Sequence, residues 1–103
     1  MDNRRTIEIL ENLIDKYKLE EAQKQIEDIL YTDSQNIELL LLLGKIKTKQ
    51  QQYGDALNIY ANVLSLDNNN EQARVSIKMI NNILEIRRSF YFENTYTDDD
   101  LYL

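Results

Sequence analysis

The chain has 103 residues and a formal net charge of −6, and it contains no cysteine, histidine, tryptophan or proline. Since a chain of this length buries one modest core, we expect a single domain. Without His and Cys the usual acid–base, nucleophilic and metal-ligating side chains are missing, so we expect a non-enzyme with no catalytic residues, metal or cofactor. The acidic balance argues against nucleic acids and anionic membranes, because both are bound mainly through Lys and Arg.

The N-terminal residues carry no recognisable targeting signal. Met1 and Asp2 come shortly before two arginines, and the stretch that follows is amphipathic and charged, unlike the apolar region of a secretory signal. The longest apolar run, at residues 39–43, is far shorter than the ~20 residues that span a bilayer. We therefore expect a cytoplasmic protein.

Helix breakers are nearly absent, since Gly44 and Gly54 are the two glycines and proline is lacking. The breaks between helical segments are short and polar, and two of them hold Asp, Asn or Ser residues suited to cap the next helix. The pattern predicts an all-α fold of five antiparallel helices. Apolar residues recur at helical spacing over residues 4–16, 20–31, 37–50, 54–66 and 71–90.

The sequence also repeats itself with a period of 34 residues. Sliding residues 3–36 onto residues 37–70 superposes four identical pairs and several pairs of similar type, such as Ile26 with Tyr60. These matches keep both helices and the following turn in register, so we expect two structural repeats. The identical pairs are Ala22 with Ala56, Leu30 with Leu64, Asp33 with Asp67, and Asn36 with Asn70.

Residues 37–70 resemble the tetratricopeptide repeat family, whose unit is a helical hairpin of this length. The matching positions are Leu40, Leu43, Gly44, Tyr53, Gly54, Asp55, Ala56, Tyr60, Leu64, Leu66, Asp67, Asn69 and Asn70. The resemblance implies that Gly44 and Ala56 are small because paired helices approach there, and that Tyr60 fills the space between repeats. In the first repeat, Leu10 stands where the family has glycine.

The resemblance further implies how the chain is organised. Repeat one spans residues 3–36, repeat two spans residues 37–70, and the hairpins form a right-handed α-α superhelix. A capping helix at 71–92 completes a single domain of residues 1–92. Residues 93–103 follow as an acidic, aromatic tail.

Members of this family hold a peptide or a partner helix in a concave groove lined by the first helix of each repeat, and they are not catalysts. The resemblance therefore implies a protein-binding scaffold or adaptor, and a client-specific chaperone is an alternative. The implied lining is Ile7, Ile14, Leu41, Lys45, Thr48, Lys49, Val75, Met79 and Asn82. Core packing would also explain the apolar members, and a solvated helix face would explain the two lysines.

One specific groove function is excluded by the residues present. A subfamily grips the C-terminal carboxylates of chaperones with a clamp of Lys, Asn and Arg side chains. None of these residue types stands at the matching positions, which are Ile7, Glu11, Leu42, Gln72 and Ser76.

The predicted capping helix carries more apolar surface than a cap requires. A first stripe suffices to cover the array, and it consists of Ala73, Ile77, Ile80 and Leu84. A second stripe lies beside it and consists of Val75, Met79, Ile83, Ile86 and Phe90. Since a terminal helix should present a polar outer face, something is expected to cover this second stripe. A homodimer is therefore an alternative function, with a contact surface of Ile83, Ile86, Phe90, Tyr91 and Phe92.

The tail at residues 93–103 carries four acidic side chains and no basic one, so it holds −4 of the net charge. It also contains tyrosine and leucine, whereas disordered acidic termini are usually poor in aromatics. Disorder is one interpretation of this segment. The other is docking, in which the aspartates at 98–100 meet the two groove lysines of the same chain or of a neighbour.

Overall fold

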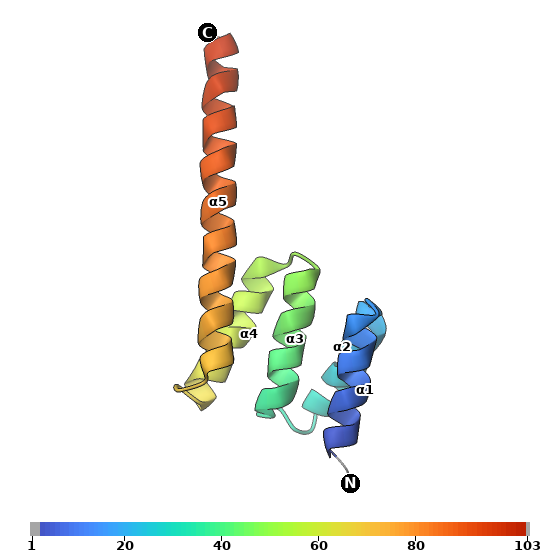
Figure 1. The fold of residues 1–103 in the computed structure, drawn as a ribbon. Coiled ribbons are helices and arrows are strands. Elements are labelled where there is room, and N and C mark those ends of the chain that lie inside the picture. The colour runs from blue at the N-terminus through green and yellow to red at the C-terminus, as the bar shows by residue number, and fades with distance from the viewer. Residues whose placement is uncertain (1–2, 103) are drawn as a thin grey trace.

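Five α-helices joined by short turns form the structure, which is a computed structural model that describes the backbone of residues 3–102 and the side chains of residues 4–90 (Figure 1). No strand occurs within residues 3–102, so the all-α prediction is confirmed. The first four helices begin and end within one residue of their predicted limits. The helices are α1 (Asn3–Asp15), α2 (Leu19–Leu30), α3 (Ile37–Lys49), α4 (Tyr53–Leu66) and α5 (Glu71–Tyr102).

The last helix is longer than the sequence predicted. The capping helix was expected to end at residue 92, but α5 continues to Tyr102. No proline occurs in the chain and no glycine follows Gly54, so no helix breaker interrupts this stretch. The backbone of residues 98–100 therefore lies at the far end of α5, away from α3 (Figure 1). The predicted docking of this segment into the groove of its own chain is not formed, and its side chains lie outside the described residues.

The helices recur at a fixed interval. The helices α1, α3 and α5 begin at residues 3, 37 and 71, and α2 and α4 begin at residues 19 and 53, so each start is 34 residues from its equivalent. The turns inside the hairpins match as well. Tyr17 and Gln51, also 34 apart, have positive φ angles of 61° and 62°. Their N–H groups donate to Ile14 O and Thr48 O, both at 2.9 Å. The two hairpins therefore share one turn conformation.

The turns between hairpins are built alike from an Asp and an Asn. Asn36 Oδ1 accepts from Leu39 N at 3.1 Å at the start of α3, and Asn70 Oδ1 accepts from Ala73 N at 2.8 Å at the start of α5. The side-chain amide of each Asn donates to the Asp three residues before it. These caps satisfy backbone N–H groups that have no partner inside the helix.

Each helix packs against the next one in the chain, and α3 also contacts both α1 and α5. The face formed by α1, α3 and α5 is thus distinct from the side where α2 and α4 lie (Figure 1).

The central helix, α3, belongs to two hydrophobic cores at once. Leu39, Leu42, Leu43 and Ile46 pack with α1 and α2, whereas Leu40 and Leu41 pack with α4 and α5. This explains the run of five leucines at residues 39–43, because a helix covered on both sides needs apolar residues around most of its circumference.

A small residue and a large one face each other where α3 meets α4. A Cβ atom added at Gly44 would lie 2.6 Å from Cζ of Tyr60, so the tyrosine ring lies directly against the glycine backbone. At the equivalent positions of the first hairpin, Leu10 and Ile26 are both fully buried. The second hairpin fills the space between its two helices with a small and a large residue, whereas the first fills the equivalent space with Leu and Ile. Both combinations leave the space closely packed.

The final helix leaves the bundle after its first half. Leu84, which is partly buried, packs against the second core. The Arg87 guanidinium lies 5.1 Å from the ring centroid of Tyr53 and donates a hydrogen bond to Gln51 Oε1 at 3.4 Å. Beyond this point α5 projects away from the other helices, which gives the molecule its elongated extents of 65 × 30 × 20 Å (Figure 1).

Candidate functional site

The face of α1, α3 and α5 carries two adjoining pockets that share Gln72. The larger, which we call the lysine pocket, has a volume of about 320 Å³ and lies between α3 and α5, above Tyr60 of α4. Its lining is Lys45, Thr48, Lys49, Tyr60, Gln72, Ser76 and Met79. The smaller, the carboxylate pocket, measures about 90 Å³ and is lined by Ile7, Glu11, Glu38, Leu41, Leu42 and Gln72.

Hydroxyl groups form the floor of the lysine pocket. Tyr60 is 3% exposed, and its phenol is hydrogen-bonded to the side chains of Ser76 and Thr48. Thr48 Oγ1 in turn donates to Gly44 O at 2.8 Å. Burial raises the pKa of the Tyr60 phenol above its usual value, and the two side-chain hydrogen bonds act in the opposite direction. Tyr60 is therefore a neutral, fixed hydrogen-bonding group at ordinary pH.

Two lysines supply the charge at this pocket. Lys45 is exposed, and within the described residues it forms no ion pair or hydrogen bond. Lys49 is half-buried, and its Nζ lies 5.5 Å from the ring centroid of Tyr17, whose hydroxyl donates to Lys49 O at 3.2 Å. Among the side chains that the structure describes, no carboxylate is paired with either lysine. The pocket thus presents two ammonium groups above a polar floor.

The predicted groove residues divide into three groups. Lys45, Thr48, Lys49 and Met79 come together in the lysine pocket, and Ile7 and Leu41 in the carboxylate pocket. Val75 is exposed at 59%, and Asn82 is also exposed, but neither lines a pocket. Ile14 is 1% exposed and packs in the first core, so it is not available to a partner. This last placement corrects the prediction, because α2 and α3 cover that turn of α1.

The sequence prediction did not include Tyr60 or Ser76 as lining residues. Tyr60 reaches the pocket from α4, and because Gly44 has no side chain the ring passes beneath α3. Ser76 could have been found from its spacing, since residues 72, 76 and 79 share one helix face and Met79 was already placed there.

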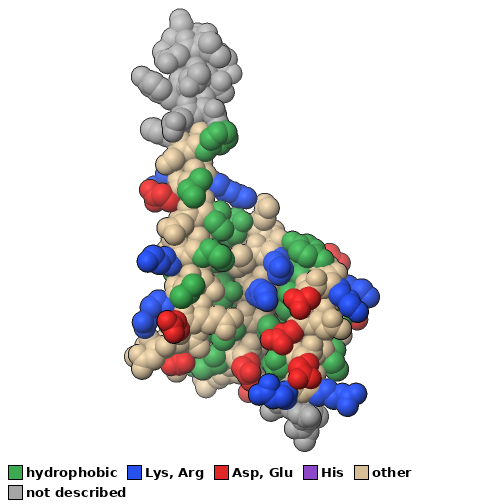
Figure 2. All heavy atoms as spheres, in the orientation of Figure 1, with side chains coloured by type: hydrophobic (Ala, Val, Ile, Leu, Met, Phe, Trp, Pro, Cys, Tyr) green, Lys and Arg blue, Asp and Glu red, His purple; other side chains and the backbone are tan. Residues whose placement is uncertain are grey.

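The second stripe of α5 is largely uncovered in the single chain. Val75, Met79, Ile86 and Phe90 are exposed at 59%, 46%, 67% and 69%, and Ile83 is half-buried. In Figure 2, hydrophobic side chains follow α5 along one face and basic side chains lie on the neighbouring half of α3. Tyr91 and Phe92, also predicted for self-association, have side chains outside the described residues.

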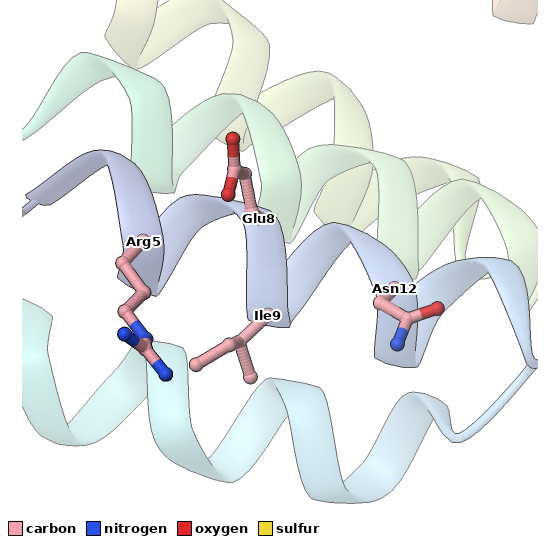
Figure 3. Close-up of a pocket in the computed structure, with 4 residues that line it drawn as sticks. All are labelled: Arg5, Glu8, Ile9 and Asn12. Atoms are coloured by element: carbon pink, nitrogen blue, oxygen red, sulfur yellow. The ribbon is translucent and has the colours of Figure 1, made fainter.

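A further depression, of about 620 Å³, lies on α1 and is lined by Arg5, Glu8, Ile9 and Asn12 (Figure 3). All four residues come from one helix, and Glu8 points away from Arg5 and Ile9. A surface made by a single helix face provides little enclosure, so we regard it as open surface and not as a binding site.

Within the described residues, no group of three or more His, Cys, Asp or Glu side chains is placed to hold a metal ion. The helices described also include none long and apolar enough to cross a membrane.

No protein-family model matches the chain, and no curated protein or solved structure is significantly similar to it.

Proposed function

We propose that the chain is a non-enzymatic scaffold of the tetratricopeptide type that binds a peptide or a partner helix against α1, α3 and α5. Three features support the assignment to this type: helices that recur every 34 residues, the shared hairpin turn, and the close contact of Gly44 with Tyr60. Each is a feature expected of stacked helical hairpins.

The observation that carries the binding proposal is the pair of adjoining pockets on one face. Together they offer two lysines and a partly buried cluster of hydroxyl groups in one pocket and two glutamates in the other, and Met79 adds an exposed apolar side chain to the first. A face that combines apolar contacts with charges of both signs suits a partner segment that is itself amphipathic.

Affinity capture from lysate of the cells that make this protein tests the proposal. Met79→Glu places a charge in the groove and should reduce the captured partner about tenfold, because a few central, desolvated contacts carry most of the binding energy of an interface. Ile9→Glu is the matched control, since Ile9 is 49% exposed against 46% for Met79 but lies in the depression on α1. Capture that is unaffected by Met79→Glu, or lost equally in both variants, would contradict a role for the groove.

Self-association through α5 is the second candidate function. The observation in its favour is that Ile86 and Phe90, two thirds exposed, lie where α5 leaves the bundle. Large apolar side chains grouped on one helix face usually mark an interface.

A further inference from the structure

The lysine pocket lacks a counter-charge among the side chains of residues 4–90, which the structure describes. Lys45 and Lys49 have no carboxylate partner among the described side chains, although the chain as a whole is acidic. The chain's largest concentration of acid is the segment at residues 93–103, with four acidic residues and no basic one. This segment is the natural complement of the pocket by charge.

A single molecule cannot bring the two together while α5 is intact. Asp99 lies 20 residues beyond Met79, the α5 residue that lines the pocket, which places it about 30 Å away along the helix axis. The acidic segment therefore has to come from another molecule.

The uncovered stripe of α5 leads from the pocket towards the acidic end. At 100° per residue, Val75, Met79, Ile83, Ile86 and Phe90 fall within an arc of about 80°. Met79 belongs both to this stripe and to the pocket lining. A helix that lay along the stripe would therefore end at the lysines.

One register of two antiparallel α5 helices satisfies both surfaces. In an antiparallel pair, the numbers of two residues at the same level add up to a constant. At 100° per residue Asp100 falls about 20° from Val75, next to the stripe, and placing it at the level of Met79 of the other copy puts the midpoint between residues 89 and 90. Ile86 and Phe90, the most exposed apolar residues of the stripe, then lie on either side of the midpoint. The pairing is two-fold symmetric, as most homodimer contacts are.

We infer that the chain forms an antiparallel dimer through α5, in which the acidic segment at residues 93–103 of each copy occupies the lysine pocket of the other. The inference rests on the proposed function, since it takes the groove as the binding face and names a second copy as its occupant. Apolar contacts along the stripe supply affinity, and the contacts of the aspartates with Lys45 and Lys49 fix the register.

Light scattering coupled to size exclusion, with carbodiimide cross-linking of a mixture of ¹⁴N and ¹⁵N chains, tests this arrangement. The reagent joins a lysine amine directly to a carboxylate, and the isotope mixture identifies links between two molecules. The expected result is twice the monomer mass and intermolecular links from Lys45 or Lys49 to residues 98–100. A monomer at several hundred micromolar, or links confined to one chain, would overturn the inference.

Charge reversal provides the second test. Lys45→Glu with Lys49→Glu should raise the dimer dissociation constant about tenfold at low salt, since a few exposed charge pairs are lost. Lys16→Glu with Lys24→Glu changes the net charge equally at exposed positions outside the lysine pocket and should have a much smaller effect. Replacing the aspartates at 98–100 with lysine in the variant that carries Lys45→Glu and Lys49→Glu should restore dimer formation. Equal effects of the two lysine variants, or no restoration, would refute the assigned register.

The two proposals can fail separately. A monomeric chain whose capture of partners depends on Met79 would remove the dimer and leave the scaffold function standing. A dimer with the expected cross-links, but with no capture that depends on the groove, would support the pairing and contradict the binding of other proteins.

Discussion

At the scale of single residues, the size of the side chain at position 44 depends on the residue at position 60, because the Tyr60 ring lies against the place that a Cβ atom of residue 44 would take. The equivalent pair in the first hairpin, Leu10 and Ile26, consists of two fully buried side chains of equal size. The glycine is required by the tyrosine ring and not by backbone conformation, because neither glycine has a positive φ angle.

We predict that Gly44→Ala lowers the free energy of unfolding by about 1–3 kcal/mol, because the ring of Tyr60 must move to admit the Cβ atom. Gly54→Ala is the control and should raise it by about 0.5–1 kcal/mol, since nothing lies within 4 Å of the added Cβ atom and alanine favours the helix. Urea denaturation of both variants measures the difference. A stabilising Gly44→Ala would show that Tyr60 does not pack against α3.

At the scale of the elements, the starts of α3 and α5 each depend on an asparagine cap. The carboxylate of Asp33 or Asp67 accepts from the cap amide, which leaves the cap Oδ1 free to accept from the helix. No side-chain cap bond forms at Lys18 or Gln52, the residues before α2 and α4. The closing helices are instead positioned by the short turn and by packing.

Asn70→Ala should cost about 1 kcal/mol of stability, because the N–H of Ala73 loses its partner at 2.8 Å. The neighbouring Asn69→Ala should change stability by less than about 0.5 kcal/mol, since Asn69 bonds through its backbone N–H. Thermal unfolding followed by circular dichroism compares the two. Similar losses in both variants would mean that the turn itself, and not the cap, is being weakened.

The elements also show how far the sequence alone could lead. Helical spacing and polar breaks located the starts of all five helices, because amphipathic helices with short loops leave a clear pattern. The pattern was less informative for α3, where burial on two sides removes the periodicity that indicates which leucine faces which core. It also could not place Ile14, whose burial depends on how α2 and α3 pack over α1.

The end of α5 could not be predicted for a different reason. Acidic residues near a helix C-terminus interact unfavourably with the helix dipole, so the aspartates at 98–100 give no signal that the helix continues through them. The structure continues the helix to Tyr102, because no glycine or proline interrupts the backbone. The lysine pocket was predicted in part, from α3 and α5, whereas the contribution of Tyr60 from α4 required the three-dimensional arrangement.

At the scale of the whole molecule, α3 ties the two cores together. Losing α1 and α2 would expose Leu39, Leu42, Leu43 and Ile46, each worth about 1.5–3 kcal/mol when buried. Partial unfolding of the first hairpin is therefore costly for the rest of the chain, and we expect one cooperative transition.

Leu10→Ala, at a fully buried position of the first core, should destabilise the molecule by about 2–5 kcal/mol. In a urea titration followed by NMR, the unfolding midpoints reported by Ile26 in the first core and by Ile80 in the second should fall by the same amount. Ile80 signals that keep their wild-type midpoint would indicate that the second core folds independently.

Because the turns before α3 and α5 have the same hydrogen bonds, one turn could replace the other. Asp33 with Asn36 and Asp67 with Asn70 present the same hydrogen bonds to the helix that follows, so α3 and α5 begin in the same local geometry. If a copy of residues 37–70 were inserted after residue 70, the turn before it and the turn between it and α5 would have the same geometry as the original turns. The length of the face formed by α1, α3 and α5 can then be set by the number of inserted units, with α5 kept as the final helix.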